Sequence, residues 1–421
     1  MVVNAYVRGN AGDAALLSVC LRHVREAFPG AAVSVAGMED PEAHDSFEGA
    51  PNLGSIRRYV ADGGVSRTRR ILRRVLLGPL ALAVLLLPRP LAGPALRLLP
   101  REAAREARAV FDADLVVSTG GGYLQAGPGL DGHQNVFFVL LPVLLAQRGG
   151  ARTVFAPQSF GPFPAAAQRR LVRRVLGRSA LVLAREDVSL RHLADCGLTG
   201  APVRRAVDSG FGFAPAPAVR WRERLGVAPG ELLIGVTARR WLAPAAQDRY
   251  ERELAAALDR HQDTGARVVL IPQVTTDYLG DDDRIVERRI AAHCRTEPLL
   301  VDERVDYRVL KGLYEECSLM VGTRFHSVVF ALTSGVPCVA IEYEHKTRGI
   351  MADLGLGAWV VPIEEVDRDA LAALIGELRE RAEEYRELLA ARMPGYVGDA
   401  ERFPDLLRQA ARSGAPVPVP A

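Results

Sequence analysis

The sequence has few cysteines, almost no lysine and no long apolar run. Its five cysteines are scattered, form no Cys-x-x-Cys pair and are odd in number, which indicates neither a disulfide framework nor a zinc site and favours a reducing compartment. Only Lys311 and Lys346 are lysines among the 53 basic residues. Because the lysine ammonium is a compact charge that the arginine fork does not reproduce, Lys346 is a candidate ligand group.

An excess of charge of one sign is also lacking. Lys and Arg total 53 and Asp and Glu total 50, a net charge of +3, which gives no support to a nucleic-acid-binding function. The 49% of hydrophobic and 24% of charged residues are typical of a globular chain. At roughly 150 residues per domain, the 421 residues predict two to three domains. The first residues lack the apolar segment of a signal peptide, so we expect a cytoplasmic protein.

The most apolar segment, Val75 to Leu87, spans 13 residues, short of the ~20 that a membrane-spanning helix needs. Arginines precede it closely, at positions 67, 69, 70, 73 and 74. A basic segment followed by an apolar one is typical of a helix that lies on an anionic membrane. Two interpretations of an insertion near residues 67–99 follow: a buried helix of the first domain, or a helix in peripheral contact with the inner face of the membrane.

Short apolar runs alternate with helical patterns along nearly the whole chain, which predicts parallel sheets covered by helices on both faces. The expected strands of the first half are Val2–Val7, Ala32–Met38, Asp114–Ser118, Thr153–Ala156, Ala180–Ala184 and Val203–Val207. Those of the second half are Leu232–Thr237, Arg267–Pro272, Leu299–Val301, Leu319–Gly322, Cys338–Glu342 and Trp359–Pro362. The predicted fold class is therefore α/β, with two Rossmann-like domains that face a central cleft.

The same alternation predicts the domain boundaries. Residues 1–210 form the first domain, and the Pro- and Ala-rich segment 211–219 is a linker. Residues 220–395 form the second domain, and residues 396–421 form a tail and a terminal helix that crosses back to the first half. Ligands of open parallel sheets bind beyond the carboxyl ends of the strands, so the cleft between the domains is the expected site.

Two glycine-containing loops directly follow strands of the first domain. Gly12 and Asp13 stand where the N-terminal amides of a helix hold an anion, although the safer interpretation of Asp13 is an N-cap. Gly120, Gly121 and Gly122 allow the backbone to approach a ligand closely. These glycines match neither the dinucleotide fingerprint nor the phosphate-binding loop with its lysine.

Three further polar residues follow strands. Gln158 either binds sugar hydroxyls or serves in a turn. Arg185 can hold a carboxylate or phosphate through two parallel hydrogen bonds, or it pairs with the acids at 186 and 187, which are usual in the first turn of a helix. Arg239 or the next residue, also an arginine, follows the first strand of the second domain and either binds an anion or lies in a solvated loop.

The segment Gly-Thr-Arg-Phe-His-Ser at 322–327 is the most informative one. A strand followed by a helix here puts Arg324, His326 and Ser327 at a helix N-terminus, where anions are favoured. The next strand brings Lys346 to the neighbouring position on the same sheet edge. A lone histidine is more often structural than catalytic, but these neighbours favour His326 as a functional group that titrates near neutral pH. No Asp/His spacing indicates a metal site.

Taken in order, these motifs resemble the polysaccharide pyruvyltransferase family. The segments that carry the resemblance are Gly9-Asn-Ala-Gly-Asp13, Ser118-Thr-Gly-Gly-Gly122, Gln158-Ser-Phe-Gly-Pro162, Ala184-Arg-Glu-Asp187, Gly322-Thr-Arg-Phe-His-Ser327 and Glu344-His-Lys346. Each motif is weak by itself, whereas the ordered set is fairly specific. The resemblance implies a fold like that of GT-B glycosyltransferases. It also implies transfer of a pyruvyl group from phosphoenolpyruvate to a sugar, as a cyclic ketal, without a cofactor or metal.

The resemblance implies roles for single residues. The histidine of the Gly-Thr-Arg-x-His-Ser motif, His326 here, is the expected acid/base, and Arg185 and Lys346 are expected to bind phosphoenolpyruvate. The first domain is the expected acceptor side and the second the phosphoenolpyruvate side. Arg185, Arg239, Arg324 and Lys346 together match the phosphate and carboxylate of this co-substrate, and Arg324 at a helix N-terminus would stabilise the departing phosphate.

Other functions remain compatible with the same residues. A GT-B glycosyltransferase with a nucleotide-sugar donor would also use a basic cluster and glycine loops, although no ribose-binding acid pattern follows residues 319–346. A non-catalytic scaffold of a bacterial cell-envelope or exopolysaccharide pathway would dock through residues 67–87 and would not need the basic cluster. A lipid-linked sugar acceptor would explain a basic and apolar insertion. The acceptor sugar, the ketal positions and the oligomeric state are not specified by the sequence.

Overall fold

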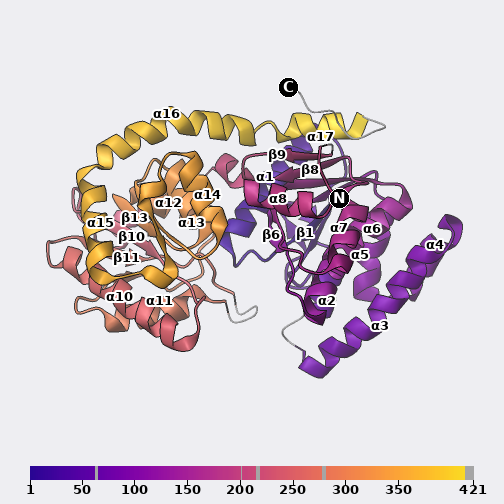
Figure 1. The fold of residues 1–421 in the computed structure, drawn as a ribbon, viewed down its shortest axis with the longest axis horizontal. Helices are drawn as coiled ribbons and strands as arrows, with labels where there is room; N and C mark the ends of the chain where they lie inside the picture. Colours follow the sequence, from indigo (N-terminus) through magenta and orange to yellow (C-terminus); the bar gives the residue numbers. More distant parts are fainter. Residues whose placement is uncertain (62–64, 201, 215–218, 277–280, 413–421) are drawn as a thin grey trace. The chain divides into compact units, whose positions relative to one another are not determined.

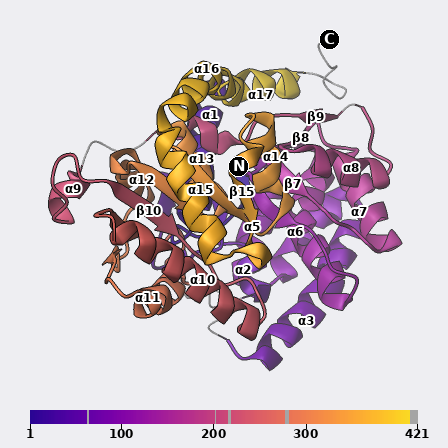
Figure 2. The ribbon, with the colours of Figure 1, turned by 60° about the vertical axis from the view of Figure 1, so that its left-hand side comes forward.

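The chain folds into two compact units, each built around its own sheet (Figures 1 and 2). The computed structural model describes residues 1–61, 65–200, 202–214, 219–276 and 281–412. The first unit consists of Met1–Val7, Leu16–Ser209 and Asp399–Ala421, and the second of Arg8–Ala15 and Gly210–Gly398. The loop after the first strand is therefore part of the second unit.

The sheet of the first unit is parallel, in the order β2-β1-β5-β7-β8-β9, with β6 paired to β7. Its strands are β1 Val2–Ala5, β2 Val35–Gly37, β5 Leu115–Ser118, β6 Gly121–Leu124, β7 Arg152–Phe160, β8 Leu181–Ala184 and β9 Val203–Arg205. A small antiparallel pair, β3 Ser46–Phe47 and β4 Ala50–Pro51, lies outside this sheet.

Neighbouring residues of these strands point to opposite faces and enter two separate apolar cores. Val2 and Val117 pack with α1 and α17, whereas Val3 and Val116 pack with α5, α6 and α7. The period of two along a strand thus places the sheet between two helical layers. The helices of this unit are α1 Ala11–Ala27, α2 Ile56–Ala61, α3 Arg67–Leu86, α4 Arg89–Ala95, η1 Leu96–Leu98, α5 Arg101–Phe111, α6 Leu130–Gly149, α7 Ala166–Leu176, α8 Asp187–Asp195 and α17 Phe403–Arg412.

The sheet of the second unit is parallel in the order β12-β11-β10-β13-β14-β15. Its strands are β10 Leu233–Thr237, β11 Arg267–Leu270, β12 Leu299–Leu300, β13 Leu319–Gly322, β14 Cys338–Glu342 and β15 Val360–Pro362. Its helices are η2 Ser209–Gly212, α9 Trp221–Arg224, α10 Pro244–Gln262, α11 Asp283–His293, α12 Tyr307–Glu316, α13 Phe325–Thr333, α14 His345–Asp353, η4 Gly357–Trp359, η5 Ile363–Glu365, α15 Arg368–Glu380 and α16 Ala382–Ala400.

The α/β class with two parallel sheets is confirmed, and every strand expected from the sequence is present with ends shifted by a few residues. The segment 211–219, expected as a linker, begins with buried side chains. Phe213 stacks on Phe330 with ring centroids 5.4 Å apart, because an aromatic ring gains more from burial than from lying in a solvated linker. Residues 215–218 of that segment lie outside the described residues.

The insertion near residues 67–99 is helical, but most of its apolar surface is exposed. Helix α3 begins after Ser66, whose hydroxyl accepts a hydrogen bond from the backbone N–H of Arg69 at 3.4 Å. Its buried side chains are Leu77, Ala81 and Val84. The interpretation as a buried helix therefore holds for one narrow face. None of the helices in the described residues has the length and hydropathy to cross a bilayer.

Glu106 on α5 is a buried carboxyl whose titration affects stability. Its Oε2 accepts a hydrogen bond from the Ile56 backbone N–H at 2.6 Å, and Oε1 has no hydrogen-bond partner among the residues that the structure describes. Burial raises the pKa of Glu106 to about 7, against the smaller opposing effects of that bond and of Arg57. The folded chain thus keeps a proton that the unfolded chain releases at its ordinary carboxyl pKa.

We expect Glu106→Gln to remove this pH dependence. Because the folded-state pKa is raised, the wild type loses stability as the pH rises from the ordinary carboxyl range to about 7, and the loss is constant above it. The variant should equal the wild type near pH 4 and exceed it at pH 8 by up to about 3 kcal/mol. Urea denaturation at the two pH values measures the difference. An equal advantage at both pH values would contradict this account.

Candidate active site

Three loops of the second unit meet because β10, β13 and β14 are neighbours in its sheet. Each strand ends at the same edge, since all three are parallel. Arg239 follows β10, Arg324 follows β13, and Lys346 lies on α14, directly after β14. The predicted cations of the second domain thus come from adjacent positions of one sheet edge.

Ser327 fixes the turn from β13 into α13. Its hydroxyl donates to the Arg324 carbonyl at 2.6 Å and lies 2.8 Å from Thr237 Oγ1 at the end of β10. Thr237 Oγ1 also accepts from the Thr323 backbone N–H at 3.0 Å. Ser327 was predicted to bind substrate, and the structure gives its hydroxyl a local role that orients Arg324 and His326.

Arg324 is held by a buried ion pair that the sequence analysis did not identify. Its Nε donates to both carboxylate oxygens of Asp283 at 3.1 Å, and its Nη2 donates to Asp281 at 2.7 Å. The Asp283 side chain is 1% exposed and also accepts from the backbone N–H groups of Gln273 and Val274. A guanidinium can satisfy several acceptors at once because it carries five N–H donors in a rigid plane.

Burial and charge act in opposite directions on these acids. Burial raises the pKa of Asp283 above its ordinary value, although Arg324 opposes the shift. Asp281 is more exposed: burial alone would raise its pKa, but the charge and hydrogen bond of Arg324 outweigh it and lower that pKa. Arg324 remains charged because both carboxylates favour its cationic form.

Tyr343 organises the remaining two cations. The Arg239 guanidinium lies 4.1 Å from the centroid of the Tyr343 ring, and Lys346 Nζ lies 5.5 Å from it. Burial would raise the pKa of Tyr343, but Lys346, Arg239 and Arg324 together lower it below its ordinary value. Lys346 also pairs with Glu344 at 2.6 Å. The aromatic residue after β14 was visible in the sequence but was given no role there.

The loop after β1 brings Gly12 against His326. The Ala11 backbone N–H donates to the Gln273 carbonyl at 2.9 Å, and the Thr275 N–H donates to the Gly9 carbonyl at 2.7 Å, so this loop is bonded to the segment after β11. A Cβ atom on Gly12 would lie 2.1 Å from His326 Nδ1. Glycine is needed here for contact with the imidazole, whereas the sequence analysis explained it by anion binding.

Asp13 does not take the N-cap position expected as its safer interpretation. Helix α1 begins at Ala11, and the side-chain oxygen of Asn10 accepts from the Asp13 backbone N–H at 3.3 Å. The Asn10 amide in turn donates to the Asp13 carboxylate at 2.6 Å. Asn10 is therefore the capping residue, and Asp13 is an acid of the first helical turn.

The predicted glycine loop of the first unit forms an additional strand. Gly121 opens β6 and pairs with Gln158 of β7. A Cβ atom on Gly120 would lie 2.8 Å from the Pro157 carbonyl oxygen. The close approach at Gly120 is therefore made by the protein's own backbone. Gly122 lies in the same strand and is half-buried.

Gln158 and Arg185 are both buried in the first unit. The Gln158 side chain is fully buried, and among the described residues neither of its polar side-chain atoms has a hydrogen-bond partner. Arg185 Nη1 donates to Asp208 at 2.5 Å, its Nε donates to the Ser159 hydroxyl at 2.9 Å, and Glu186 lies 3.4 Å away. Of the two acids considered from the sequence, Glu186 is a partner, while the shorter contact is to Asp208.

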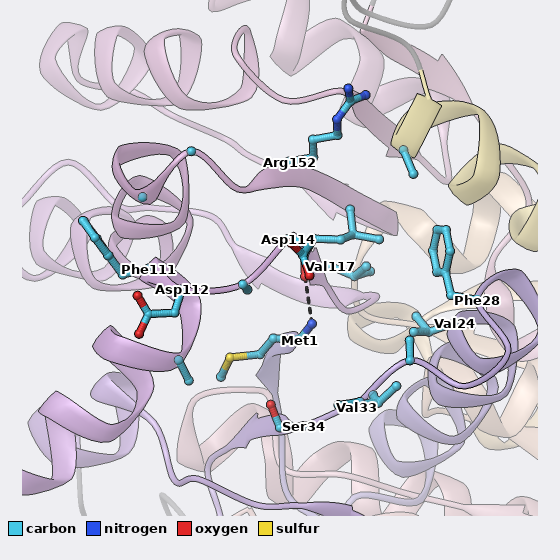
Figure 3. Close-up of a pocket in the computed structure, with 18 of the residues that line it drawn as sticks. Met1, Val24, Phe28, Val33, Ser34, Phe111, Asp112, Asp114, Val117 and Arg152 are labelled. Atoms are coloured by element: carbon cyan, nitrogen blue, oxygen red, sulfur yellow. Dashed lines mark hydrogen bonds between the residues drawn. The ribbon is translucent and has the colours of Figure 1, made fainter. Parts of the chain in front are cut away.

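A cavity of the first unit lies at the opposite end of its sheet. It has a volume of about 920 Å³, and its lining includes Met1, Ser34, Asp114 and Arg152, which stand before or at the first residues of their strands (Figure 3). The predicted binding loops follow the carboxyl ends of the strands instead. This cavity is therefore separate from the candidate site. Among the described residues, no group of His, Cys, Asp or Glu side chains is arranged to hold a metal ion.

Each of the two units has a parallel sheet with polar loops at the carboxyl ends of its strands. This arrangement defines the class of proteins with two Rossmann-like units. Solved structures with similar folds include the S. aureus MnaA–UDP co-structure, at 12% identity over 100% of this chain and 99% of that chain with a TM-score of 0.60. A putative UDP-N-acetylglucosamine 2-epimerase from Listeria monocytogenes has 14% identity over 96% and 93% of the two chains and a TM-score of 0.58. These neighbours are GT-B-fold enzymes, which confirms the predicted fold class.

Residues 10–345 match the model of the family described as polysaccharide pyruvyl transferase, and the chain belongs to that family. The amylovoran biosynthesis protein AmsJ of Erwinia amylovora is 27% identical over 249 residues. That similarity spans 55% of this chain and 59% of AmsJ.

We expect Arg324→Met to destabilise the second unit in a pH-dependent way. Removal of the cation leaves Asp283 buried without its charge partner, which costs roughly 3 to 5 kcal/mol at neutral pH. The variant should regain stability as the pH falls towards the ordinary carboxyl pKa, because protonation removes the buried charge and the folded state binds that proton more tightly. Urea denaturation at pH 5 and pH 8 measures both effects.

Arg288→Met is the matched control for this prediction. Arg288 pairs with Asp302 at 2.6 Å in the same unit, but both side chains are about half exposed. An exposed ion pair contributes about 1 kcal/mol or less. Two outcomes would contradict a supporting role for the buried pair. One is that Arg324→Met lowers the free energy of unfolding as little as the control does, and the other is that its effect does not depend on pH.

Proposed function

We propose that the protein transfers the pyruvyl group of phosphoenolpyruvate to a sugar of a polysaccharide or glycolipid precursor, forming a cyclic ketal and releasing phosphate. The observation that carries the proposal is that Arg239 and Lys346 both lie over the Tyr343 ring, while His326 lies in the first turn of the helix that follows the strand between theirs, in a chain that belongs to the pyruvyl transferase family. Phosphoenolpyruvate carries a carboxylate and a phosphate, which match two cations at the same sheet edge.

The two cations differ in geometry, and we assign them different parts of the donor. Arg239 is 12% exposed, and its guanidinium lies over the rings of Tyr343 and Trp241. The planar fork suits a planar carboxylate through two parallel hydrogen bonds. Lys346 is 15% exposed and offers a point charge on a flexible stem, which suits a phosphate group.

The reaction balances without an oxidant, reductant or cofactor. Protonation of the methylene carbon of phosphoenolpyruvate makes an oxocarbenium-like carbon, which the first sugar hydroxyl attacks with loss of its proton. A second sugar hydroxyl then attacks the same carbon and closes the ketal. Phosphate leaves with the proton of this second hydroxyl. We propose His326 as the group that supplies the first proton and receives one from the hydroxyl. The N-terminus of α13 and Arg324 stabilise negative charge on the departing phosphate.

The first unit is proposed as the acceptor side. Gln158 is the strongest candidate there, because its buried amide has no hydrogen-bond partner in the part of the chain that the structure describes and so retains its donors and acceptor for a sugar hydroxyl. Gly120, Gly121 and Gly122 hold the strand beside it. Arg185 stays a proposed phosphoenolpyruvate ligand, because its guanidinium can hold a carboxylate or phosphate through two parallel hydrogen bonds.

Lys346 allows a direct test of donor binding, because the chain has only one other lysine. We expect calorimetry to show micromolar phosphoenolpyruvate binding that Lys346→Met weakens by tenfold or more, since a charge-assisted hydrogen bond contributes about 1.5 to 3 kcal/mol. Lys311→Met is the matched control, because Lys311 is buried on α12 and pairs with Glu315. Binding of a UDP-sugar with no response to phosphoenolpyruvate would overturn the proposal in favour of a glycosyltransferase.

His326→Ala separates catalysis from binding. We expect kcat to fall by about 10²- to 10⁴-fold, as is typical when a general acid or base is removed, while the Kd of phosphoenolpyruvate changes by less than about threefold. His293→Ala in the same unit is the control, because His293 lies on α11 with a weak contact to Asp248 at 3.9 Å. Phosphate release in the presence of acceptor measures kcat. A variant with unchanged turnover would exclude the assigned proton transfer.

A further inference from the structure

Helix α3 of the first unit presents a second apolar face that none of the described residues covers. Eleven large apolar side chains are exposed among the described residues, and eight of them fall between residues 71 and 98. On α3 these are Ile71, Leu72, Val75, Leu76, Leu82 and Leu86, each at least 50% exposed, and Leu91 and Leu98 follow on α4 and η1. We call these eight residues the α3 apolar face.

The spacing shows that the α3 apolar face is continuous along the helix. Its members on α3, at positions 71, 72, 75, 76, 82 and 86, each lie one, three, four or seven positions from another member, so they form a stripe along one side of the helix. The buried residues Leu77, Ala81 and Val84 lie between them in sequence and point into the unit. Figures 1 and 2 show α3 at the periphery of the first unit. An apolar stripe of this size is unusual on a monomer surface and indicates an interaction site.

The charged residues of the α3 segment itself all have one sign, and one of them, Arg74, pairs with Asp131 of α6 at 3.3 Å. Between residues 63 and 101 the sequence contains eight arginines and no aspartate or glutamate. Arg73 and Arg74 donate hydrogen bonds to the carbonyls of Tyr59 and Val60 on α2 and thereby hold α3 in place. Arg67 and Arg69, in the first turn of α3, are exposed. They leave positive charge at the amino end of an apolar stripe.

A groove with the same chemistry adjoins the α3 apolar face. It has a volume of about 500 Å³ and shares Leu82 and Leu86 with that face. Its remaining apolar wall comes from residues of α6 and α7, among them Phe137 and Leu171, and its cationic border includes Arg174 and Arg178. Apolar side chains bordered by arginines thus extend from α3 onto the body of the unit.

We propose that the α3 apolar face docks on the surface of a bilayer that contains anionic lipid. Its leucines enter the boundary between headgroups and acyl chains, while Arg67, Arg69, Arg174 and Arg178 contact lipid phosphates. A second copy of this chain is a poorer occupant, because its copy of residues 63–101 contains arginines and no acidic residue that could pair with them. Proline at position 79 and the arginines at the start of α3 are compatible with a helix that lies in the interface rather than across it.

The test is co-sedimentation of the full chain with vesicles of phosphatidylcholine alone and of phosphatidylcholine mixed with phosphatidylglycerol. We expect binding to the mixed vesicles only. Leu72→Glu/Leu76→Glu should reduce the partition coefficient by tenfold or more, and Arg67→Gln/Arg69→Gln by about fivefold for each arginine removed. The effect of the arginines should diminish at high salt. Because no donor or acceptor is used, the result does not depend on the proposed pyruvyl transfer.

Ile285→Glu is the matched control for the leucine variant. Ile285 on α11 is also 50% exposed but belongs to the second unit, so its replacement should leave vesicle binding unchanged. Circular dichroism shows that each variant is folded, and Leu86→Glu provides a second position on the same face. Equal binding to both vesicle types, or wild-type binding by the leucine variants, would overturn the proposal. So would a dimer in light scattering that the leucine variants dissociate without any vesicle binding.

Discussion

The buried ion pair between Arg324 and Asp283 supports the whole candidate site of the second unit. Asp283 accepts hydrogen bonds from the backbone of the loop after β11, and Arg324 stands where β13 turns into α13. One carboxylate thus connects two loops of the sheet with the first turn of α11. The loop after β1 is bonded to the same segment through the Gln273 carbonyl. The contact between Gly12 and His326 therefore depends on this pair.

Sheet order explains why several cations lie at one edge of the sheet, and nearby acids explain why their repulsion is tolerated. β13 lies between β10 and β14, so the side chains that follow these strands are close in space while far apart in sequence. The repulsion among Arg239, Arg324 and Lys346 is offset by Asp281, Glu344 and the face of the Tyr343 ring. Arg239 and Lys346 are half-buried and can exchange their acidic partners for an anionic ligand at moderate cost in free energy. Arg324 is held by two carboxylates and is therefore more firmly anchored.

The strands and the fold class were predictable because apolar runs of strand length, separated by helical patterns, have few alternative arrangements. The helix start at residues 324–327 was predictable for the same local reason. The partners of the charged residues were not. Asp283 is 41 residues from Arg324, and Asp208 is 23 residues from Arg185. Such pairs depend on which loops the sheet order brings together. The role of Gly120 was missed likewise, because the atom that excludes a side chain there belongs to Pro157 of another strand.

Helix α3 shows a different limit of pattern analysis. A surface helix normally has one apolar face and one polar face, so an apolar run that lacks this alternation is naturally interpreted as buried. In α3 the inward residues Leu77 and Val84 are apolar, but so are the outward residues Leu72, Leu76 and Leu86. A helix with two apolar faces needs two apolar environments. The neighbouring helices α2 and α6 supply one of them, and nothing in the described part of the chain supplies the other. The arginines at one end of the uncovered face then decide what chemistry the second environment must have, because an uncharged apolar partner would leave them without counter-charges.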